Sequence, residues 1–158
     1  MFQVGDKIVH PMHGAGIIES IVTKKVNGVV RDYYTLKLPE RAMLVMIPVE
    51  NCTEVGVRSI VDCEYAVEVL RCFPTLHVEM TQNWNRRYRE NMERLKSGDL
   101  MEVARVVKGL MMRDAEHGLS TGERKMLHSA KQILVSEIVL SAGIPYEEVE
   151  GLMDVPST

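Results

Sequence analysis

The chain lacks both an excess of basic residues and the long apolar runs of a membrane protein. Its 19 lysines and arginines are outnumbered by 22 aspartates and glutamates, so the net charge of −3 excludes binding to polyanions by bulk attraction. No apolar run approaches the roughly 18 residues of a membrane-spanning helix, and the N-terminus lacks a cationic leader followed by an apolar stretch. We therefore expect a cytoplasmic protein that does not contact a membrane.

Cysteine is scarce and irregularly spaced. Cys52, Cys63 and Cys72 are odd in number, and their spacing matches neither a disulfide framework nor a Cys-x-x-Cys metal site. We expect all three to be small buried hydrophobic residues. We also expect no metal at His10 and His13, because the proline between them prevents a helix that would bring both imidazoles to one face.

The usual signatures of catalysis are missing as well. The sequence has no glycine-rich phosphate loop, no nucleophile-elbow pattern and no histidine with a nucleophile close by. Glu147, Glu148 and Glu150 form an acidic group, but on a short terminal helix such residues make a solvated face. We therefore predict a protein that is not an enzyme and that needs no cofactor and no small-molecule substrate.

The pattern of apolar residues and turns along the sequence changes near residue 58. Before it, strand-like stretches rich in β-branched residues alternate with turns. Asn27-Gly28 separates two of these stretches and is a strong signal for a hairpin, because both turn positions need a positive φ. Short strands separated by regularly spaced turns predict a small barrel of about five strands. The stretches expected to form strands are 2–9, 16–26, 29–38 and 43–49.

Beyond residue 58 the apolar periodicity becomes helical. Ser59 is the expected start of a first helix over 60–71, which Phe73-Pro74 ends. Residues of the N-cap type precede the later helices, and two of these caps are followed three residues later by a glutamate, as in a capping box. The expected starts are Thr81 or Asn83 for a helix ending at 96, Asp99 for 100–116, Ser120 for 121–142 and Pro145 for 146–153.

These two patterns together predict an α+β protein. A small β-barrel domain over residues 1–57 is followed by an all-helical domain over residues 58–158. The junction between them is short, which limits the freedom of one half against the other.

The single tryptophan, Trp84, stands at the head of the densest basic cluster, Asn83-Trp84-Asn85-Arg86-Arg87-Tyr88-Arg89. An indole beside guanidinium groups is the pairing that nucleic-acid binders use, with the ring for a base step and the cations for phosphates. Arginines in the first turn of a helix oppose its dipole, and a bound phosphate would offset that cost. The cluster therefore predicts a local contact with nucleic acid.

A packing role for the tryptophan is the competing interpretation. Trp84, Tyr88, Met92 and Leu95 fall at intervals of four, four and three, which places them on one stripe of a helix. A tryptophan in such a stripe is more often a core residue than a DNA wedge. Spacing alone leaves both interpretations open.

Five separated stretches resemble the CarD/CdnL family of bacterial transcription regulators, whose N-terminal module is shared with the RNA-polymerase-interacting domain of the transcription-repair coupling factor. The resemblance spans nearly all of the chain. Its stretches are Val4-Gly5-Asp6 with Pro11-Met12-His13-Gly14-Ala15-Gly16; Ile47-Pro48-Val49-Glu50-Asn51 with Val55-Gly56-Val57-Arg58; Asn83-Trp84-Asn85-Arg86-Arg87-Tyr88; Lys96-Ser97-Gly98-Asp99; and Gly118-Leu119-Ser120-Thr121-Gly122-Glu123-Arg124-Lys125-Met126-Leu127.

The resemblance implies that a Tudor/SH3-like barrel docks on the β subunit of RNA polymerase by pairing an edge strand. Family members carry basic residues at the positions of Lys24 and Met46; Lys24 keeps the charge and Met46 does not, so the salt dependence of docking is open. The residues implied in this contact are Lys24, Met43, Leu44, Val45, Met46 and Ile47.

The resemblance also implies that the helical domain lies on promoter DNA at the upstream edge of the melted region. Trp84 would enter the minor groove there, and the phosphate contacts would come from Arg86, Arg87, Arg89 and Arg124. The prediction is thus a regulator that stabilises the open promoter complex. The alternative is a protein-interaction module whose helical half binds a protein partner instead of DNA.

Overall fold

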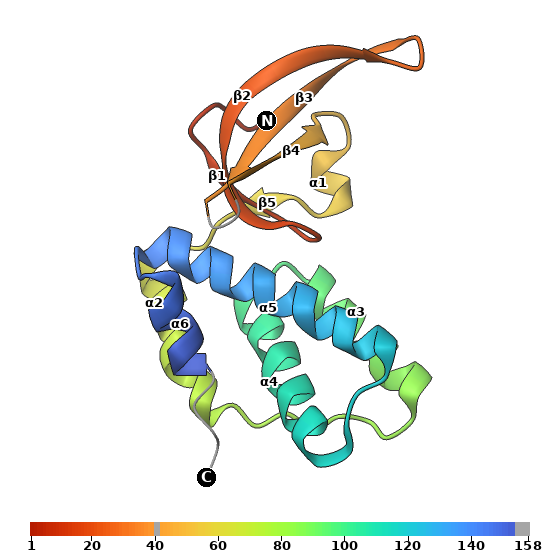
Figure 1. Ribbon diagram of the computed structural model, residues 1–158, viewed down its shortest axis with the longest axis vertical. Coiled ribbons are helices and arrows are strands. Elements are labelled where there is room, and N and C mark those ends of the chain that lie inside the picture. The colour runs from red at the N-terminus through yellow and green to blue at the C-terminus, as the bar shows by residue number, and fades with distance from the viewer. Residues whose placement is uncertain (40–41, 154–158) are drawn as a thin grey trace.

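The computed structural model describes residues 1–39 and 42–153 and has an antiparallel sheet followed by helices, which confirms the α+β class (Figure 1). None of the helices within these ranges has the length and hydrophobicity that a membrane crossing requires. The strands are β1 (Lys7–His10), β2 (Gly14–Val26), β3 (Val29–Leu38), β4 (Met43–Pro48) and β5 (Arg58–Ser59). The helices are α1 (Cys52–Val55), α2 (Cys63–Cys72), α3 (Trp84–Lys96), α4 (Leu100–His117), α5 (Thr121–Ala142) and α6 (Tyr146–Met153), with a 3-10 turn η1 (Phe73–Thr75).

The sheet has the strand order β4-β3-β2-β1-β5, and every neighbouring pair is antiparallel. Asn27 and Gly28 have φ values of 53° and 80°, which confirms the predicted hairpin turn between β2 and β3. This hairpin extends past the rest of the sheet (Figure 1). Over the described residues β4 and β5 lie at the two ends of the strand order, so the structure shows a five-stranded sheet, and its closure into a barrel stays a prediction.

The two halves have separate cores that meet at β1 and β2. The sheet packs its own apolar cluster, including Ile8, Tyr34 and Leu36, against Cys52 of α1. Alternate residues of β1 and β2 face the other way, and Val9 and Ala15 are buried in the helical core. The sheet therefore rests on α5, which contacts both strands.

Helix capping follows the sequence closely in the second half. The side chains of Asn83, Asp99 and Ser120 accept hydrogen bonds from the backbone amides at the starts of α3, α4 and α5. Gly143 ends α5 with a φ of 70°, as its position after the last apolar residue predicted.

The predicted start of the first helix is wrong. Ser59 belongs to β5 and pairs with Ile8, while α2 begins at Cys63 and is capped by Asp62. The reason is that the backbone here is bound elsewhere: the amide of Ile60 donates to the carbonyl of Lys7 at 3.2 Å. Hydrogen bonding to the sheet thus delays the helix by one turn.

Only one of the cysteines has the predicted environment. Cys52 is buried, whereas Cys63 is exposed and Cys72 is partly exposed. The buried residues of α2 begin one turn after Cys63, at Ala66, so Cys63 lies outside the contact with the core.

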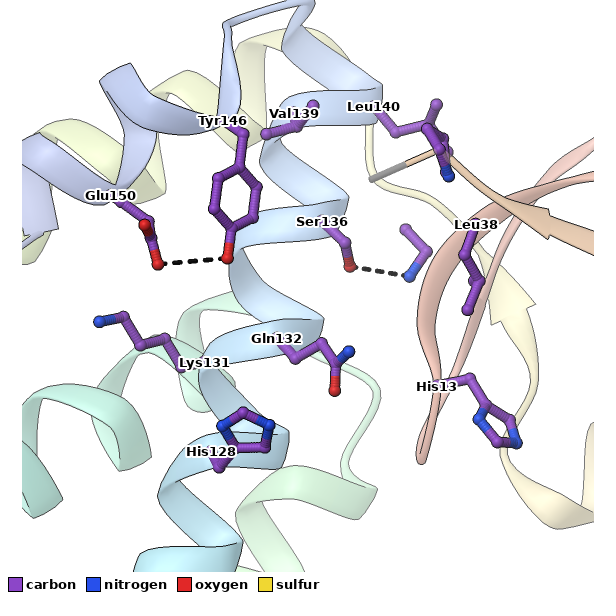
Figure 2. A pocket seen from close by; sticks show the side chains of 12 residues that line it. His13, Leu38, His128, Lys131, Gln132, Ser136, Val139, Leu140, Tyr146 and Glu150 are labelled. Atoms are coloured by element: carbon purple, nitrogen blue, oxygen red, sulfur yellow. Dashed lines mark hydrogen bonds between the residues drawn. The ribbon is translucent and has the colours of Figure 1, made fainter. Parts of the chain in front are cut away.

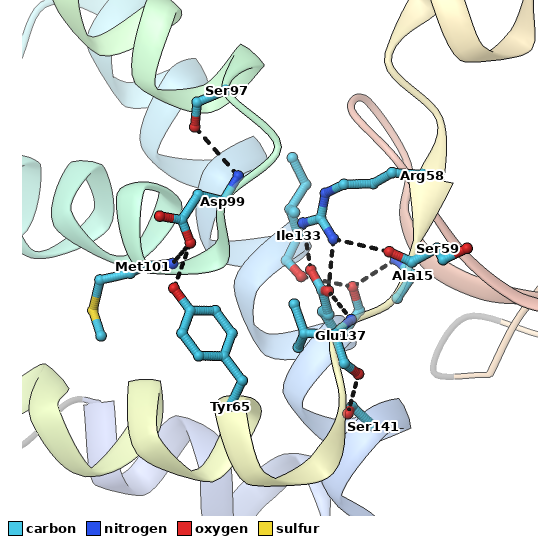
Figure 3. A network of polar contacts seen from close by, with 12 residues as sticks. Ala15, Arg58, Ser59, Tyr65, Ser97, Asp99, Met101, Ile133, Glu137 and Ser141 are labelled. Carbon is cyan, nitrogen blue, oxygen red and sulfur yellow. Dashed lines mark hydrogen bonds and ion pairs between the residues drawn. The ribbon is translucent and has the colours of Figure 1, made fainter.

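A buried ion pair joins the halves, and Figure 3 shows its setting. The Glu137 side chain of α5 is fully buried, and its two carboxylate oxygens accept hydrogen bonds from Arg58 at 2.7 and 2.8 Å. The same carboxylate accepts the backbone amide of Val61 at 2.9 Å. One glutamate therefore binds both the last strand of the sheet and the segment that leads into α2.

Two serines on either side of Glu137 extend this junction. Ser141 Oγ donates to the carbonyl of Val61 at 2.6 Å, and Ser136 Oγ accepts the amide of Ala15 in β2 at 2.8 Å. Beside the Ser136 contact, a cleft of about 570 Å³ lies between the sheet, α5 and α6 (Figure 2). The sheet is thus held to α5 by directional bonds at Ser136 and Glu137, and Ser141 holds the segment that follows β5.

Arg58→Ala should destabilise the protein by about 3 kcal/mol, because it leaves the buried carboxylate of Glu137 without its counter-charge. This is the lower end of the usual range for a broken buried pair, since the Arg58 side chain is still 21% exposed. Urea unfolding followed by circular dichroism measures the change. Arg71→Ala is the control, because the Arg71–Glu68 pair lies on the surface and should matter little. Equal unfolding midpoints for Arg58→Ala and wild type would contradict the expectation.

Candidate nucleic-acid interface

Trp84 is the first residue of α3, and its side chain is 41% exposed. The indole stacks on Tyr88, with ring centroids 5.1 Å apart and planes 19° from parallel. Its Nε1–H donates to Ser120 Oγ at 2.8 Å. Gly122 lies beside both rings, and a Cβ there would be only 3.6 Å from Trp84 Cζ2. The ring is therefore fixed against the protein while part of it faces solvent.

The apolar stripe of α3 provides the packed surface that supports the indole. Tyr88, Met92 and Leu95 are partly buried and pack against the helical core, as their spacing predicted. Trp84 continues the stripe but lies beyond the edge of the core, in the first turn. The packing interpretation is thus right for three members of the stripe and does not describe the fourth.

Arg87 is enclosed within the protein. Its side chain is 3% exposed and pairs with Glu123 through Nε–Oε2 and Nη2–Oε1 distances of 2.7 and 3.1 Å. Its Nη1 donates to the backbone carbonyls of Thr81 and Gln82 at 3.0 and 2.9 Å. This placement differs from the phosphate contact expected of Arg87, because its hydrogen bonds are all internal. The bonds to Glu123 tie α3 to α5, and those to Thr81 and Gln82 hold the segment ahead of α3.

The other three predicted arginines lie at the surface. Arg86 and Arg89 are exposed on α3, and Arg124 is exposed in the first turn of α5. Arg86 Nε is 3.0 Å from Glu90 Oε1, but its side chain stays 74% exposed. The bond from Trp84 to Ser120 brings the starts of α3 and α5 together. These cations therefore share one end of the molecule with the indole and with two helix N-termini, which themselves favour anions.

Glu123 is a buried residue of this site whose capping contact the sequence predicts but whose pairing with Arg87 it does not. Its backbone amide donates to Ser120 Oγ at 3.2 Å, as the capping-box spacing predicted. Its carboxylate, however, accepts from Arg87 and from the Ser120 hydroxyl. Hydrogen bonding by Arg87 lowers the pKa of Glu123, against burial, which raises it. The carboxylate is therefore held in its charged form inside the protein.

Five of the six predicted docking residues, 43 to 47, lie on β4, which forms one edge of the sheet, and the sixth, Lys24, lies on β2. Leu44 and Met46 are 55% and 39% exposed, whereas Val45 is partly buried and Ile47 is buried. The strand register places Leu44 opposite Lys37, Met46 opposite Thr35, and Lys24 opposite Arg31 on the same face of the sheet.

Not all of the docking residues come together. Lys24 lies on the part of the β2–β3 hairpin that extends past the Pro48 end of β4, since Pro48 pairs with Tyr33 and Lys24 with Arg31. Met43 is at the opposite end of the strand and is 46% exposed. The edge therefore offers an apolar outward face, with the charge of Lys24 displaced along the hairpin.

The two histidines of the first turn are packed together. The rings of His10 and His13 lie 4.6 Å apart, and His10 Nδ1 accepts the amide of Met12 at 3.0 Å. Burial, followed by the charge of His13, lowers the pKa of His10 to about 4. No group of three or more His, Cys, Asp or Glu that could hold a metal ion occurs in the part of the chain that the structure describes.

Two family models match the chain in the order that this architecture suggests. Residues 2–61 match the CarD-like/TRCF RID domain, and residues 68–154 match the CarD C-terminal domain. These matches define a transcription regulator built from a sheet module and a helical module. The chain belongs to the CarD family, as the sequence resemblance indicated. It is 35% identical to the "Putative transcription factor YdeB" of Bacillus subtilis (strain 168) over 151 residues. The matched segment covers 96% of this chain and 99% of that protein.

The charged state of Glu123 makes stability depend on pH. Because its folded pKa lies below the ordinary value of 4.5, its contribution is complete above pH 4.5 and is lost as the pH falls through the lowered pKa. The difference in unfolding free energy between wild type and Glu123→Gln should therefore shrink below pH 4.5. Urea titrations between about pH 3 and pH 7 measure this difference. A difference that is constant across the range would mean that Glu123 titrates alike in the folded and unfolded chains.

Proposed function

We propose that this protein docks on the β subunit of RNA polymerase through β4 and stabilises the open promoter complex by placing Trp84 in the minor groove at the upstream edge of the melted DNA. In this proposal residues 1–57 form a Tudor-like barrel domain that serves the polymerase, residues 58–158 form a domain that serves the DNA, and the protein acts in the bacterial cytoplasm. The observation that carries the proposal is the partly exposed indole, held against Tyr88 and Ser120 at the end of the molecule where exposed arginines of α3 and α5 lie.

The wedge acts through a difference between two DNA states. Melting leaves a distorted base step at the upstream edge of the bubble, and an apolar ring fills that gap at less cost than in intact duplex, where unstacking costs a few kcal/mol. Because the ring is favoured in the melted state, it shifts the equilibrium toward that state. The Nε1–H of Trp84 is already bonded to Ser120, so the wedge needs no base as a hydrogen-bond partner.

Phosphates would be held by the exposed cations around the ring. Arg86 and Arg124 lie in the first turns of α3 and α5, whose free amides also favour anions, and Arg89 lies in the second turn of α3. Such contacts position a protein on DNA without discriminating between sequences. Arg87 supports them indirectly by fixing α3 against α5.

The polymerase contact would use the free edge of β4. An edge strand offers unpaired backbone groups to an extended segment of a partner. Leu44 and Met46 add an apolar outward face beside that edge, and Lys24 adds one positive charge on the hairpin. Docking then raises the effective concentration of a mildly acidic protein at the promoter.

Trp84→Ala should shorten the lifetime of open complexes about tenfold or more while leaving polymerase binding intact, because a loss of about 1.4 kcal/mol corresponds to tenfold. The lifetime is measured with purified polymerase on a linear promoter after challenge with a competitor.

The reciprocal variant, Leu44→Glu with Met46→Glu, should lose both its retention on polymerase and its effect on the lifetime of open complexes. Wild-type lifetimes for Trp84→Ala would contradict the wedge. Absence of footprint protection at the upstream edge would favour a helical half that binds a protein.

Arg89→Glu should weaken promoter association and reduce the slope of log K against log salt concentration by about one, since one phosphate contact is lost. Titrations of promoter complexes across a salt series measure the slope. The matched control is Arg71→Glu, which makes the same charge change on the exposed surface of α2. If the Arg89 and Arg71 variants had the same slope as wild type, Arg89 would not contact phosphate.

A further inference from the structure

Ser120 lies where the cap of α5 meets the exposed indole. Its Oγ accepts a hydrogen bond from Trp84 Nε1 at 2.8 Å and another from the amide of Glu123 at 3.2 Å. Its hydroxyl donates to Glu123 Oε1 at 3.2 Å. A serine hydroxyl has one donor and two acceptor sites, so its hydrogen-bonding capacity is fully used.

The direction of the hydroxyl is set by groups that cannot move easily. The Glu123 side chain is 2% exposed, and its carboxylate is paired at two points with Arg87, which in turn binds the carbonyls of Thr81 and Gln82 ahead of α3. The hydroxyl hydrogen therefore points toward a fixed carboxylate. This leaves its lone pairs for the helix amide and for the indole.

We propose that Ser120 is a positioning residue whose hydroxyl fixes the orientation in which Trp84 meets DNA. The inference rests on the proposed role of Trp84 as a wedge. The stack on Tyr88 limits tilting of the ring but allows it to slide and turn in its own plane, whereas the bond at Nε1 stops that motion. A ring held in its bound orientation loses less conformational freedom when it enters the groove.

The positioning role can be separated from the capping role because other residues cap without holding the indole. Glycine is only slightly worse than serine as an N-cap but offers no acceptor to Nε1. Threonine has the same hydroxyl and keeps both roles. Aspartate caps well too, yet its charge would oppose the carboxylate of Glu123.

The single tryptophan gives this test a direct readout, since tryptophan fluorescence, excited at a wavelength that the five tyrosines do not absorb, reports on Trp84 alone. In Ser120→Gly, acrylamide quenching of the free protein should rise about twofold and open complexes should decay about three- to tenfold faster. Ser120→Thr should match wild type in both. Asp62→Gly, which replaces the side-chain cap of α2 by glycine in the same way but breaks no hydrogen bond to the indole or to Ser120, is the matched control and should change neither.

A second measurement keeps the inference falsifiable on the DNA side. Trp84→Phe retains a ring but lacks Nε1–H, so Ser120→Gly should have no further effect on open-complex lifetime in that background. Quenching and lifetimes in Ser120→Gly equal to wild type would reduce Ser120 to a helix cap and overturn the inference. If Trp84→Ala itself left lifetimes unchanged, the proposed function would fail, and quenching alone would decide whether Ser120 fixes the ring.

Discussion

The arrangement of the whole molecule depends on one fully buried carboxylate, that of Glu137. It binds Arg58 from the last strand and the amide of Val61 from the segment before α2, so it fixes the sheet against the helices at the point where the chain passes from one to the other. The same helix begins with Ser120 and Glu123, which hold Trp84 and Arg87. Helix α5 therefore links the proposed polymerase contact to the proposed DNA contact.

Both junctions of α5 use a buried glutamate with an arginine from another element. Removing two charges from water costs several kcal/mol per ion, so such a pair contributes little net stability compared with apolar packing. It does require one geometry, because a two-point guanidinium–carboxylate contact is directional. For a protein proposed to bind two partners at once, a defined distance between two surfaces matters more than additional stability.

Much of the fold could be predicted from local signals, whereas the site could be predicted only in part. Asn27-Gly28 and the caps Asp99 and Ser120 act on their immediate neighbours, so their positions in the sequence are sufficient to locate the turn and these helix starts. The local pattern predicts a helix start at Ser59, but the structure pairs Ser59 with Ile8, which lies 51 positions away in another strand. The pairing of strands that are distant in sequence does not affect local periodicity, so it cannot be predicted from that periodicity.

For the arginines, too, local sequence does not reveal a distant partner, although the helical phase of α3 distinguishes one of them. Arg86, Arg87 and Arg89 look alike in the sequence, but only Arg87 lies on the core side of α3, three positions after Trp84 and four before the buried Asn91. The helical phase could therefore have separated Arg87 from its neighbours. Its partner Glu123, 36 positions further on, could not have been chosen from spacing, since that contact depends on how α3 and α5 pack.

The distance between Glu123 and Glu137 has a consequence for how this chain can vary. The two residues are 14 positions apart, which corresponds to about 21 Å and to about 40° less than four full turns. Both carboxylates therefore leave the helix on nearly the same side. Inserting or deleting one residue between them would rotate one end by about 100° against the other and separate one pair from its arginine. Between these two glutamates the exposed side chains can change, but the number of residues cannot.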